Sequence, residues 1–146
     1  NIDPANMSGA IKGRKNSYAH LNSLLANAKK SVTILTTSDG FVRKADFFKS
    51  AFKKLKEKGV KIRIATNTND SVKLAAKELN GLAEIKKLEG VKARFAVVDS
   101  KDVLMFTQND TDVHESNDVG IWVSTPYFAQ ALESMVTQNW NKLEKI

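Results

Sequence analysis

The sequence predicts an α/β fold, with a mixed, largely parallel sheet and helices on both faces. The first half of the chain alternates amphipathic helical segments with short β-branched runs, an order typical of a parallel sheet covered by helices. Two further strand-like runs, at residues 91–98 and 103–106, are separated only by a polar turn and predict an antiparallel hairpin. A third run follows at residues 119–123. With 146 residues, 42% of them hydrophobic, the chain suits one domain with its own core.

The first elements are a lead-in, a helix and a strand. Residues 1–15 are polar and rich in turn formers, which predicts an irregular linker before a single domain at residues 16–146. A strand is expected at residues 31–35, followed by a polar turn at residues 36–40. The helix before this strand is predicted from an apolar stripe at helical spacing, formed by Tyr18, Leu21, Leu25 and Ala28.

The middle of the chain predicts two helices and two strands. Residues 44–58 form a helix with phenylalanines on its inner face and lysines on its solvent face. Residues 60–65 alternate Val, Ile and Ile as a strand, and a third helix starts at Asp70 or Ser71. Residues 83–88 form a weak edge strand or a turn, since lysines suit a sheet edge.

A last helix follows the third late strand. Thr125 is its expected cap, and Pro126 occupies its first turn, where a missing N–H is tolerated. Its predicted inner face consists of Phe128, Leu132, Met135, Val136 and Trp140.

Polar side chains flank the two strands of the hairpin. Lys92 and Arg94 are two residues apart, so they share a face if the chain is extended there. Asp99 follows this strand, and Thr107 and Asn109 follow the next. We expect them to converge at one end of the sheet, where lysine and arginine donate hydrogen bonds to an anionic or hydroxyl-rich ligand. The alternative is a structural Arg94–Asp99 ion pair without a ligand.

Two hydroxyls, of Thr37 and Ser38, come directly after the strand at residues 31–35. Ligands of open α/β sheets bind at the carboxyl ends of strands, so both side chains are candidate ligand contacts. The alternative is an ordinary loop that caps the next helix.

Histidine chemistry has little support in the sequence. His20 lies beside the apolar stripe of the first helix, which favours a packed or surface side chain. His114 could bind a metal with Asp112, Glu115 or Asp118, but no second histidine is nearby in the sequence, so no metal site is predicted. The chain has no cysteine, no glycine-rich phosphate loop and no H-E-x-x-H, and no cofactor is expected.

The net charge of +7 and the pI near 9.6 leave two interpretations. A basic domain is compatible with nucleic acid, but the lysines are spread along the chain, which favours a solvated surface. No apolar run approaches the ~20 residues of a membrane span, and no signal peptide is evident, so we expect a cytoplasmic protein without membrane contact.

The spacing of the candidate residues resembles the phospholipase D superfamily pattern H-x-K-x-x-x-x-D, G-[ST]-x-N and N-x-E. Lys92, Arg94 and Asp99 occupy the His, Lys and Asp positions, and the two later patterns fall on residues 106–109 and 116–118. The resemblance covers residues 31–143 and implies a phospholipase D-like fold. The candidate ligand-binding residues are then Lys92, Arg94, Asp99, Thr107, Asn109, Ser116, Asp118, Thr37 and Ser38.

The catalytic histidine of that superfamily is absent. Its chemistry needs one imidazole to attack phosphorus and another to protonate the leaving group, whereas Lys92 and Arg94 are cations that supply no nucleophile. We therefore expect a degenerate site without catalytic residues. An active phosphodiesterase or nuclease, or a nucleic-acid-binding module, are the alternatives.

The start of the chain is similar to archaeal TrmB-type transcriptional regulators. Gly9-Ala10-Ile11-Lys12-Gly13-Arg14 precedes a helix and an Ala-Lys-Lys-x-Val-x-Ile-Leu strand, as in the region after their winged-helix domain. The resemblance implies a non-catalytic domain that senses a small effector, a sugar, sugar phosphate or other anion, and supports a homodimer. It also implies that DNA is bound through a winged-helix domain outside this chain.

Overall fold

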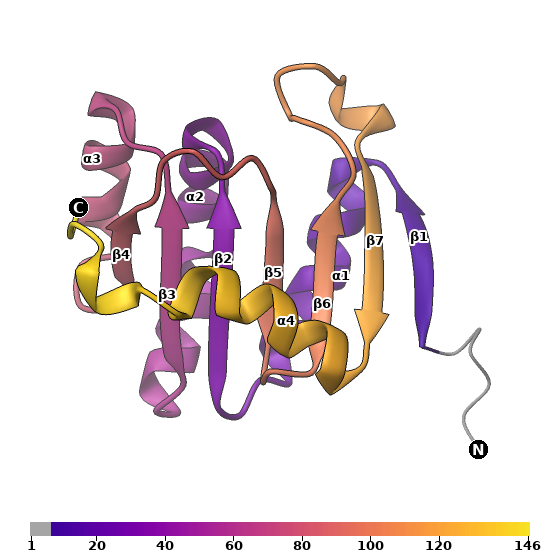
Figure 1. Cartoon of the computed structure of the whole chain (residues 1–146), viewed down its shortest axis with the longest axis horizontal. Helices are drawn as coiled ribbons and strands as arrows, with labels where there is room; N and C mark the ends of the chain where they lie inside the picture. Colours follow the sequence, from indigo (N-terminus) through magenta and orange to yellow (C-terminus); the bar gives the residue numbers. More distant parts are fainter. Residues whose placement is uncertain (1–6) are drawn as a thin grey trace.

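A seven-stranded mixed sheet organises the computed structural model, which describes residues 7–146 (Figure 1). The strand order is β1-β7-β6-β5-β2-β3-β4. The strands are β1 (Ser8–Lys12), β2 (Ser31–Thr36), β3 (Lys61–Thr66), β4 (Glu84–Lys87), β5 (Phe95–Val98), β6 (Asp102–Phe106) and β7 (Val119–Ser124).

The sheet is mixed as predicted, but it is not largely parallel. Only β2–β3 and β3–β4 pair in parallel, whereas the other four neighbouring pairs are antiparallel. The reason lies in the connections. The helices α2 and α3 allow the parallel crossovers, while β5, β6 and β7 are joined without a crossover helix and can only return antiparallel.

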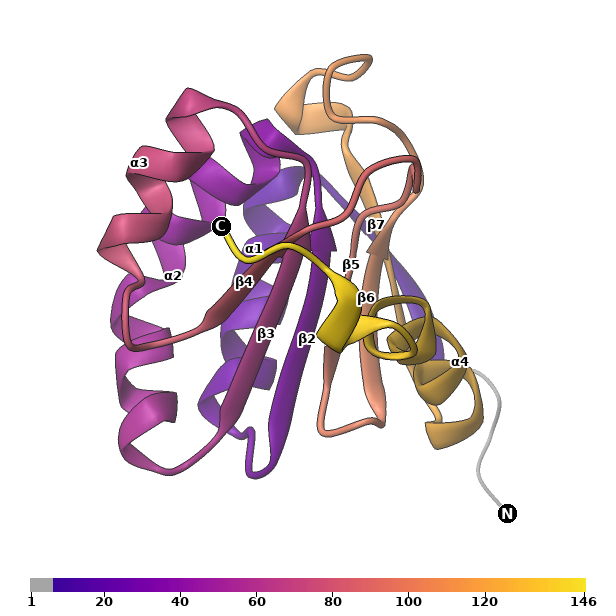
Figure 2. The ribbon, with the colours of Figure 1, turned by 60° about the vertical axis from the view of Figure 1, so that its left-hand side comes forward.

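Helices cover both faces of the sheet, as expected (Figure 2). One face carries α1 (Arg14–Ala26), α2 (Ser38–Glu57) and α3 (Asp70–Glu78), and the other carries α4 (Pro126–Thr137). Each face has its own apolar core: the larger is packed under α1, α2 and α3, and the smaller under α4 with the buried Trp140 of the 3-10 helix η3 (Trp140–Lys142).

Several predicted boundaries were wrong. Residues 1–15 are not all irregular: β1 forms an edge strand against β7 and α1 starts at Arg14, while residues 1–6 lie outside the described part of the chain. The expected turn at residues 36–40 is instead the cap and first turn of α2, because the Thr37 hydroxyl accepts a hydrogen bond from the Gly40 N–H.

The start of β5 and the inner face of α4 also differ from the prediction. β5 begins only at Phe95, so residues 91–94 precede the strand and Lys92 is exposed whereas Arg94 is buried. On α4, Met135 is 46% exposed and does not belong to the inner face. Within residues 7–146, no helix combines the length and apolar character needed to cross a bilayer.

Candidate functional site

The candidate site lies where β2 ends and β5 begins, along the line formed by the ends of the strands. Such a line of strand ends, and not an edge strand, is what we call an edge of the sheet. Because β5 is antiparallel to β2, the end of β2 and the start of β5 meet at this edge. The long β6–β7 loop, which contains the 3-10 helix η2 (Glu115–Asn117), and the start of α1 reach the same edge (Figure 1).

Asp118 is the centre of a buried ion-pair cluster at this edge. Its carboxylate is 0% exposed and accepts two hydrogen bonds from Arg94, at 3.1 and 2.9 Å, and one from Arg14 Nε at 2.9 Å. Burial alone would raise the pKa of Asp118, but the hydrogen bonds from Arg94 and Arg14 outweigh it and lower the pKa. Asp118 is therefore a carboxylate that holds two guanidinium groups in fixed positions.

Both terminal nitrogens of Arg94 are held by hydrogen bonds. Its Nη1 also donates to the Gln108 carbonyl at 2.8 Å, and its guanidinium lies over the Phe106 ring, 4.3 Å from the centroid. The side chain is 3% exposed. Such a bidentate, buried and stacked arginine is a structural partner of Asp118 and presents little of itself to solvent.

A second carboxylate, Asp110, anchors the start of α2. It accepts hydrogen bonds from Thr37 Oγ1 at 2.8 Å and from Arg43 Nη2 at 2.6 Å. Burial opposes ionisation of Asp110, but the bonds from Arg43 and Thr37 are the stronger effect, and its pKa is lowered. Its Oδ1 is buried and has no hydrogen-bond partner among residues 7–146.

Lys44 is a buried amine beside these ion pairs, not the solvent-facing lysine expected from the sequence. Its Nζ donates to Thr36 Oγ1 at 3.1 Å and lies 5.5 and 5.8 Å from the Tyr18 and Phe106 ring centroids. Burial, together with the positive charge of Arg94, lowers the pKa of Lys44 to about 7. The amine is therefore partly neutral near physiological pH.

A shallow cleft of about 340 Å³ contains much of the predicted site. Thr37, Lys92, Arg94, Thr107 and Asn109 line it. The remaining candidates lie elsewhere. Ser38 is the first residue of α2, Ser116 Oγ bonds His114 Nδ1 at 2.7 Å beside a larger cleft, and Asp118 is buried behind Arg94.

Asp99 is not at this edge, so the alternative of a structural Arg94–Asp99 ion pair was wrong. Arg94 precedes β5 and Asp99 follows it, so the two residues lie at opposite ends of the strand. The Asp99 carboxylate accepts hydrogen bonds from the backbone N–H groups of Lys29, Lys30 and Ser31, with distances of 2.7–3.1 Å. These bonds lower the pKa of Asp99 against the opposing effect of burial. The Asp99 side chain therefore joins the β5–β6 turn to the start of β2.

Four residues of the site were missed in the sequence: Arg14, Arg43, Lys44 and Asp110. Arg14 was assigned to a linker, and Lys44 to a wet helix face. Had the helix been started at Ser38, Lys44 would have fallen within the apolar stripe that contains Phe41 and Phe48. That spacing is the one signal that could have identified a buried lysine.

The family model for the N-terminal subdomain of the EBD, the effector-binding domain, of the transcriptional regulator TrmB matches residues 9–146. The chain belongs to this TrmB family. No curated protein matches it in sequence.

Solved structures confirm the phospholipase D-like fold. TrmBL2, an archaeal chromatin protein reported to show a novel mode of DNA binding, has a TM-score of 0.73 and 16% identity, and the match covers 96% of this chain and 54% of that one. Nuc of Salmonella typhimurium, a phospholipase D family member, has a TM-score of 0.71 and 15% identity, with 95% and 98% covered. NucT of Helicobacter pylori gives 0.73 and 17%, with 95% and 98% covered. The TrmB-family chain spans about half the length of TrmBL2.

Proposed function

We propose that this TrmB-family domain is a non-catalytic effector-sensing domain that also supports a homodimer in a transcriptional regulator. DNA would be bound through a winged-helix domain outside residues 1–146, in the cytoplasm. The observation that carries the proposal is the Arg94–Asp118 pair. These residues occupy two positions of the phospholipase D pattern, yet they neutralise each other in a buried, bidentate ion pair.

The same positions lack the groups that phosphodiester chemistry requires. Lys92 is exposed, and its ammonium supplies no nucleophile at neutral pH. The two histidines are engaged in other contacts, since His20 stacks on Trp122 and His114 bonds Ser116. The arginines and carboxylates at this edge are paired with one another, which leaves them to hold the fold and to line the clefts.

The shallow cleft has the chemistry of an anion or polyol site. Lys92 supplies a cation at its rim, while the exposed Thr107 and Asn109 offer a hydroxyl and an amide. Arg94 forms part of the wall with its charge already paired. The Asp112 carboxylate also lines the cleft and can accept hydrogen bonds from hydroxyls. A sugar, a sugar phosphate or another small anion fits this mixture of donors and acceptors.

The proposal is tested by two assays on the same protein. Hydrolysis of bis-p-nitrophenyl phosphate, with and without divalent metals, should stay at the buffer rate. A thermal-shift screen of sugars, sugar phosphates and carboxylates should find a ligand that raises the Tm, and Asn109→Ala should reduce this rise. Turnover that is lost in Lys92→Ala but kept in Lys101→Ala, its exposed counterpart beside Asp99, would contradict the non-catalytic interpretation. Light scattering measures whether the chain is a dimer.

A nucleic-acid-binding module is the second candidate, favoured by the net charge of +7. Affinity that depends on phosphate contacts falls with salt, with a log–log slope of roughly −0.9 per contact. We expect only weak binding of duplex DNA by this domain at physiological salt. Sub-micromolar, sequence-selective binding under those conditions would favour the second candidate.

A further inference from the structure

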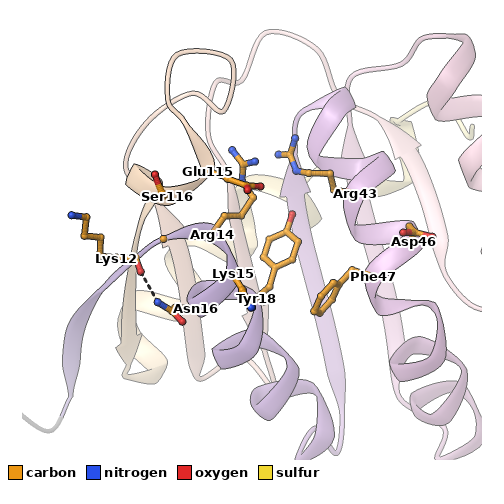
Figure 3. A pocket seen from close by; sticks show the side chains of 11 residues that line it. Lys12, Arg14, Lys15, Asn16, Tyr18, Arg43, Asp46, Phe47, Glu115 and Ser116 are labelled. Atoms are coloured by element: carbon orange, nitrogen blue, oxygen red, sulfur yellow. Dashed lines mark hydrogen bonds between the residues drawn. The ribbon is translucent and has the colours of Figure 1, made fainter.

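A second, larger cleft of about 870 Å³ opens between the start of α1, the side of α2 and η2 (Figure 3). We propose that it binds a small phosphorylated molecule, with the phosphate against Arg14, Lys15 and Arg43 and an uncharged ring on Tyr18 and Phe47. This site is separate from the shallow cleft at Lys92 and does not depend on a ligand there.

The start of α1 is the first part of the proposed phosphate site. Its N-cap is Gly13, which has φ 93° and no side chain to cap the helix, and its first turn contains no acidic residue. The first N–H groups of an α-helix lack partners within the helix, and they favour an anion. Arg14 and Lys15 add two positive charges where the helix end already favours negative charge, an arrangement that an anionic ligand would stabilise.

Two guanidinium groups that line the cleft are held in place by carboxylates, and each has N–H groups that these carboxylates do not use. Arg14 uses Nε for Asp118, and Arg43 uses Nη2 for Asp110. Among the described residues, neither side chain makes another hydrogen bond that meets normal distance and angle limits. Each carboxylate therefore orients an arginine whose remaining Nη N–H groups are left for a ligand, whereas the Arg43 Nε is buried. A rigid fork suits phosphate oxygens.

The Tyr18 hydroxyl is the independent observation that points to a ligand. Tyr18 is 5% exposed and lines the cleft, and within residues 7–146 its buried hydroxyl makes no hydrogen bond of normal geometry, although the Arg43 guanidinium is near enough to interact with it. Figure 3 shows the hydroxyl end of the ring directed toward the part of the cleft where Arg14 and Arg43 lie. A buried hydroxyl without a partner is destabilising, and a phosphate oxygen would satisfy it.

The wall of the cleft next to the proposed phosphate site is aromatic. Phe47 is 56% exposed and meets the Tyr18 ring edge to face, with centroids 5.3 Å apart. Four cationic and two anionic side chains line the cleft. Arg43 is paired with Asp110 and Arg14 shares Asp118 with Arg94, so the excess of positive charge that favours an anion comes mainly from the lysines at the start of α1. The two carboxylates that line the cleft, Asp46 and Glu115, would repel further negative charge, so the ligand should carry no second anionic group. This combination selects one phosphate joined to an uncharged ring.

The size of the cleft and the burial of the Tyr18 hydroxyl favour a small molecule over nucleic acid. The volume of the cleft lies in the range of about 300–1,000 Å³ typical of small-molecule pockets. A phosphate of a DNA backbone would contact the exposed Lys15, whereas the buried hydroxyl is less accessible to it. Binding that requires Tyr18 therefore distinguishes the two.

The experiment is an NMR titration of the 146-residue chain with phenyl phosphate, inorganic phosphate and phenol. We expect saturable binding of phenyl phosphate, at least about fivefold tighter than inorganic phosphate, with shifts concentrated at the amides of residues 14–18. Tyr18→Phe should weaken it by about tenfold, since it removes one hydrogen bond to a charged group, without lowering the Tm of the free protein. Lys15→Ala, an exposed change, should weaken all phosphate binding.

Matched variants decide the outcome. Tyr127→Phe removes a hydroxyl from the 91% exposed side chain on α4, and Lys101→Ala removes an exposed charge at the opposite edge; neither should change affinity. Lys92→Ala should also have no effect, which separates this site from the shallow cleft. Equal affinity of Tyr18→Phe and the unchanged protein, no saturation by phenyl phosphate, or equal loss in Lys15→Ala and Lys101→Ala would each overturn the proposal.

Discussion

Asp99 and Asp118 differ in what surrounds them, although the sequence placed both in one site. Asp99 lies in the β5–β6 turn and binds three backbone N–H groups, in a position that keeps part of its surface in water. Asp118 lies at the other edge of the sheet, fully buried between Arg94 and Arg14. One aspartate ties loops together, and the other compensates buried positive charge. We therefore expect the two aspartates to contribute very differently to the free energy of unfolding.

The largest effect is expected from Asp118→Asn. The variant keeps the size of the side chain but leaves Arg94 buried without a counter-charge, which costs about 3–5 kcal/mol of the free energy of unfolding. Urea denaturation followed by circular dichroism measures this loss. The unchanged protein should also lose stability as the pH falls below 3.8 and through the lowered pKa of Asp118, because protonation removes the same charge. A loss smaller than that of Asp99→Ala would contradict the comparison.

Lys44→Met tests the same buried cluster by removing a positive charge, and here a gain of stability is expected. Arg94 and Arg43 add to the unfavourable burial of the Lys44 amine, so replacing it by an apolar side chain should stabilise the fold by about 1–3 kcal/mol at pH 7. The folded pKa of about 7 lies below the usual 10.5, so the unfolded chain binds more protons between these pH values. The free energy of unfolding should therefore rise with pH across this window, and Lys44→Met should lose that rise. Lys101→Ala, an exposed lysine, is the control and should keep it.

The sequence was sufficient for the elements whose polarity pattern repeats. The alternation in β3 and most of the buried face of α2 follow from hydrophobic spacing, but Phe47, predicted on the inner face, is 56% exposed. The phospholipase D-like fold was confirmed by the solved structures. The spacing of Arg94 and Asp118 also matched the family pattern. These features depend on residues close together in the sequence or on a fixed spacing, so they can be predicted from the sequence alone.

The partners of the charged residues could not be predicted in the same way. Arg14 reaches Asp118 across 104 positions, and Arg43 reaches Asp110 across 67, so no local spacing indicates either pair. Asp99 was misplaced because β5 itself separates it from Arg94, and because the antiparallel β6 returns to the Arg94 end, where Thr107 follows it. The exact start of β5, which the sequence did not reveal, decided which side chains meet.

Asp99→Ala should have a smaller effect than Asp118→Asn. The change removes hydrogen bonds to the N–H groups of Lys29, Lys30 and Ser31, but water can replace part of them. Asp99 also has φ 55°, a conformation that alanine adopts less readily than aspartate. We expect a loss of about 1–2 kcal/mol in urea denaturation. Asp99→Asn, which keeps an acceptor and tolerates this φ, should recover most of it, and a failure to do so would mean that the charge itself matters at this edge.

The smallest effect on stability is expected from Lys92→Ala, which tests function at the edge that Asp118 organises. Lys92 is exposed, so its removal should change the free energy of unfolding by less than about 0.5 kcal/mol. The same change should reduce the Tm increase produced by any effector that binds in the shallow cleft, because the cleft loses the cation at its rim while Arg94 stays paired with Asp118. Lys101→Ala at the Asp99 edge removes an equal charge and should leave the ligand-induced Tm increase unchanged. If both variants reduce it equally, the ligand responds to the overall charge of the domain, and the edge organised by Asp118 has no special part in binding.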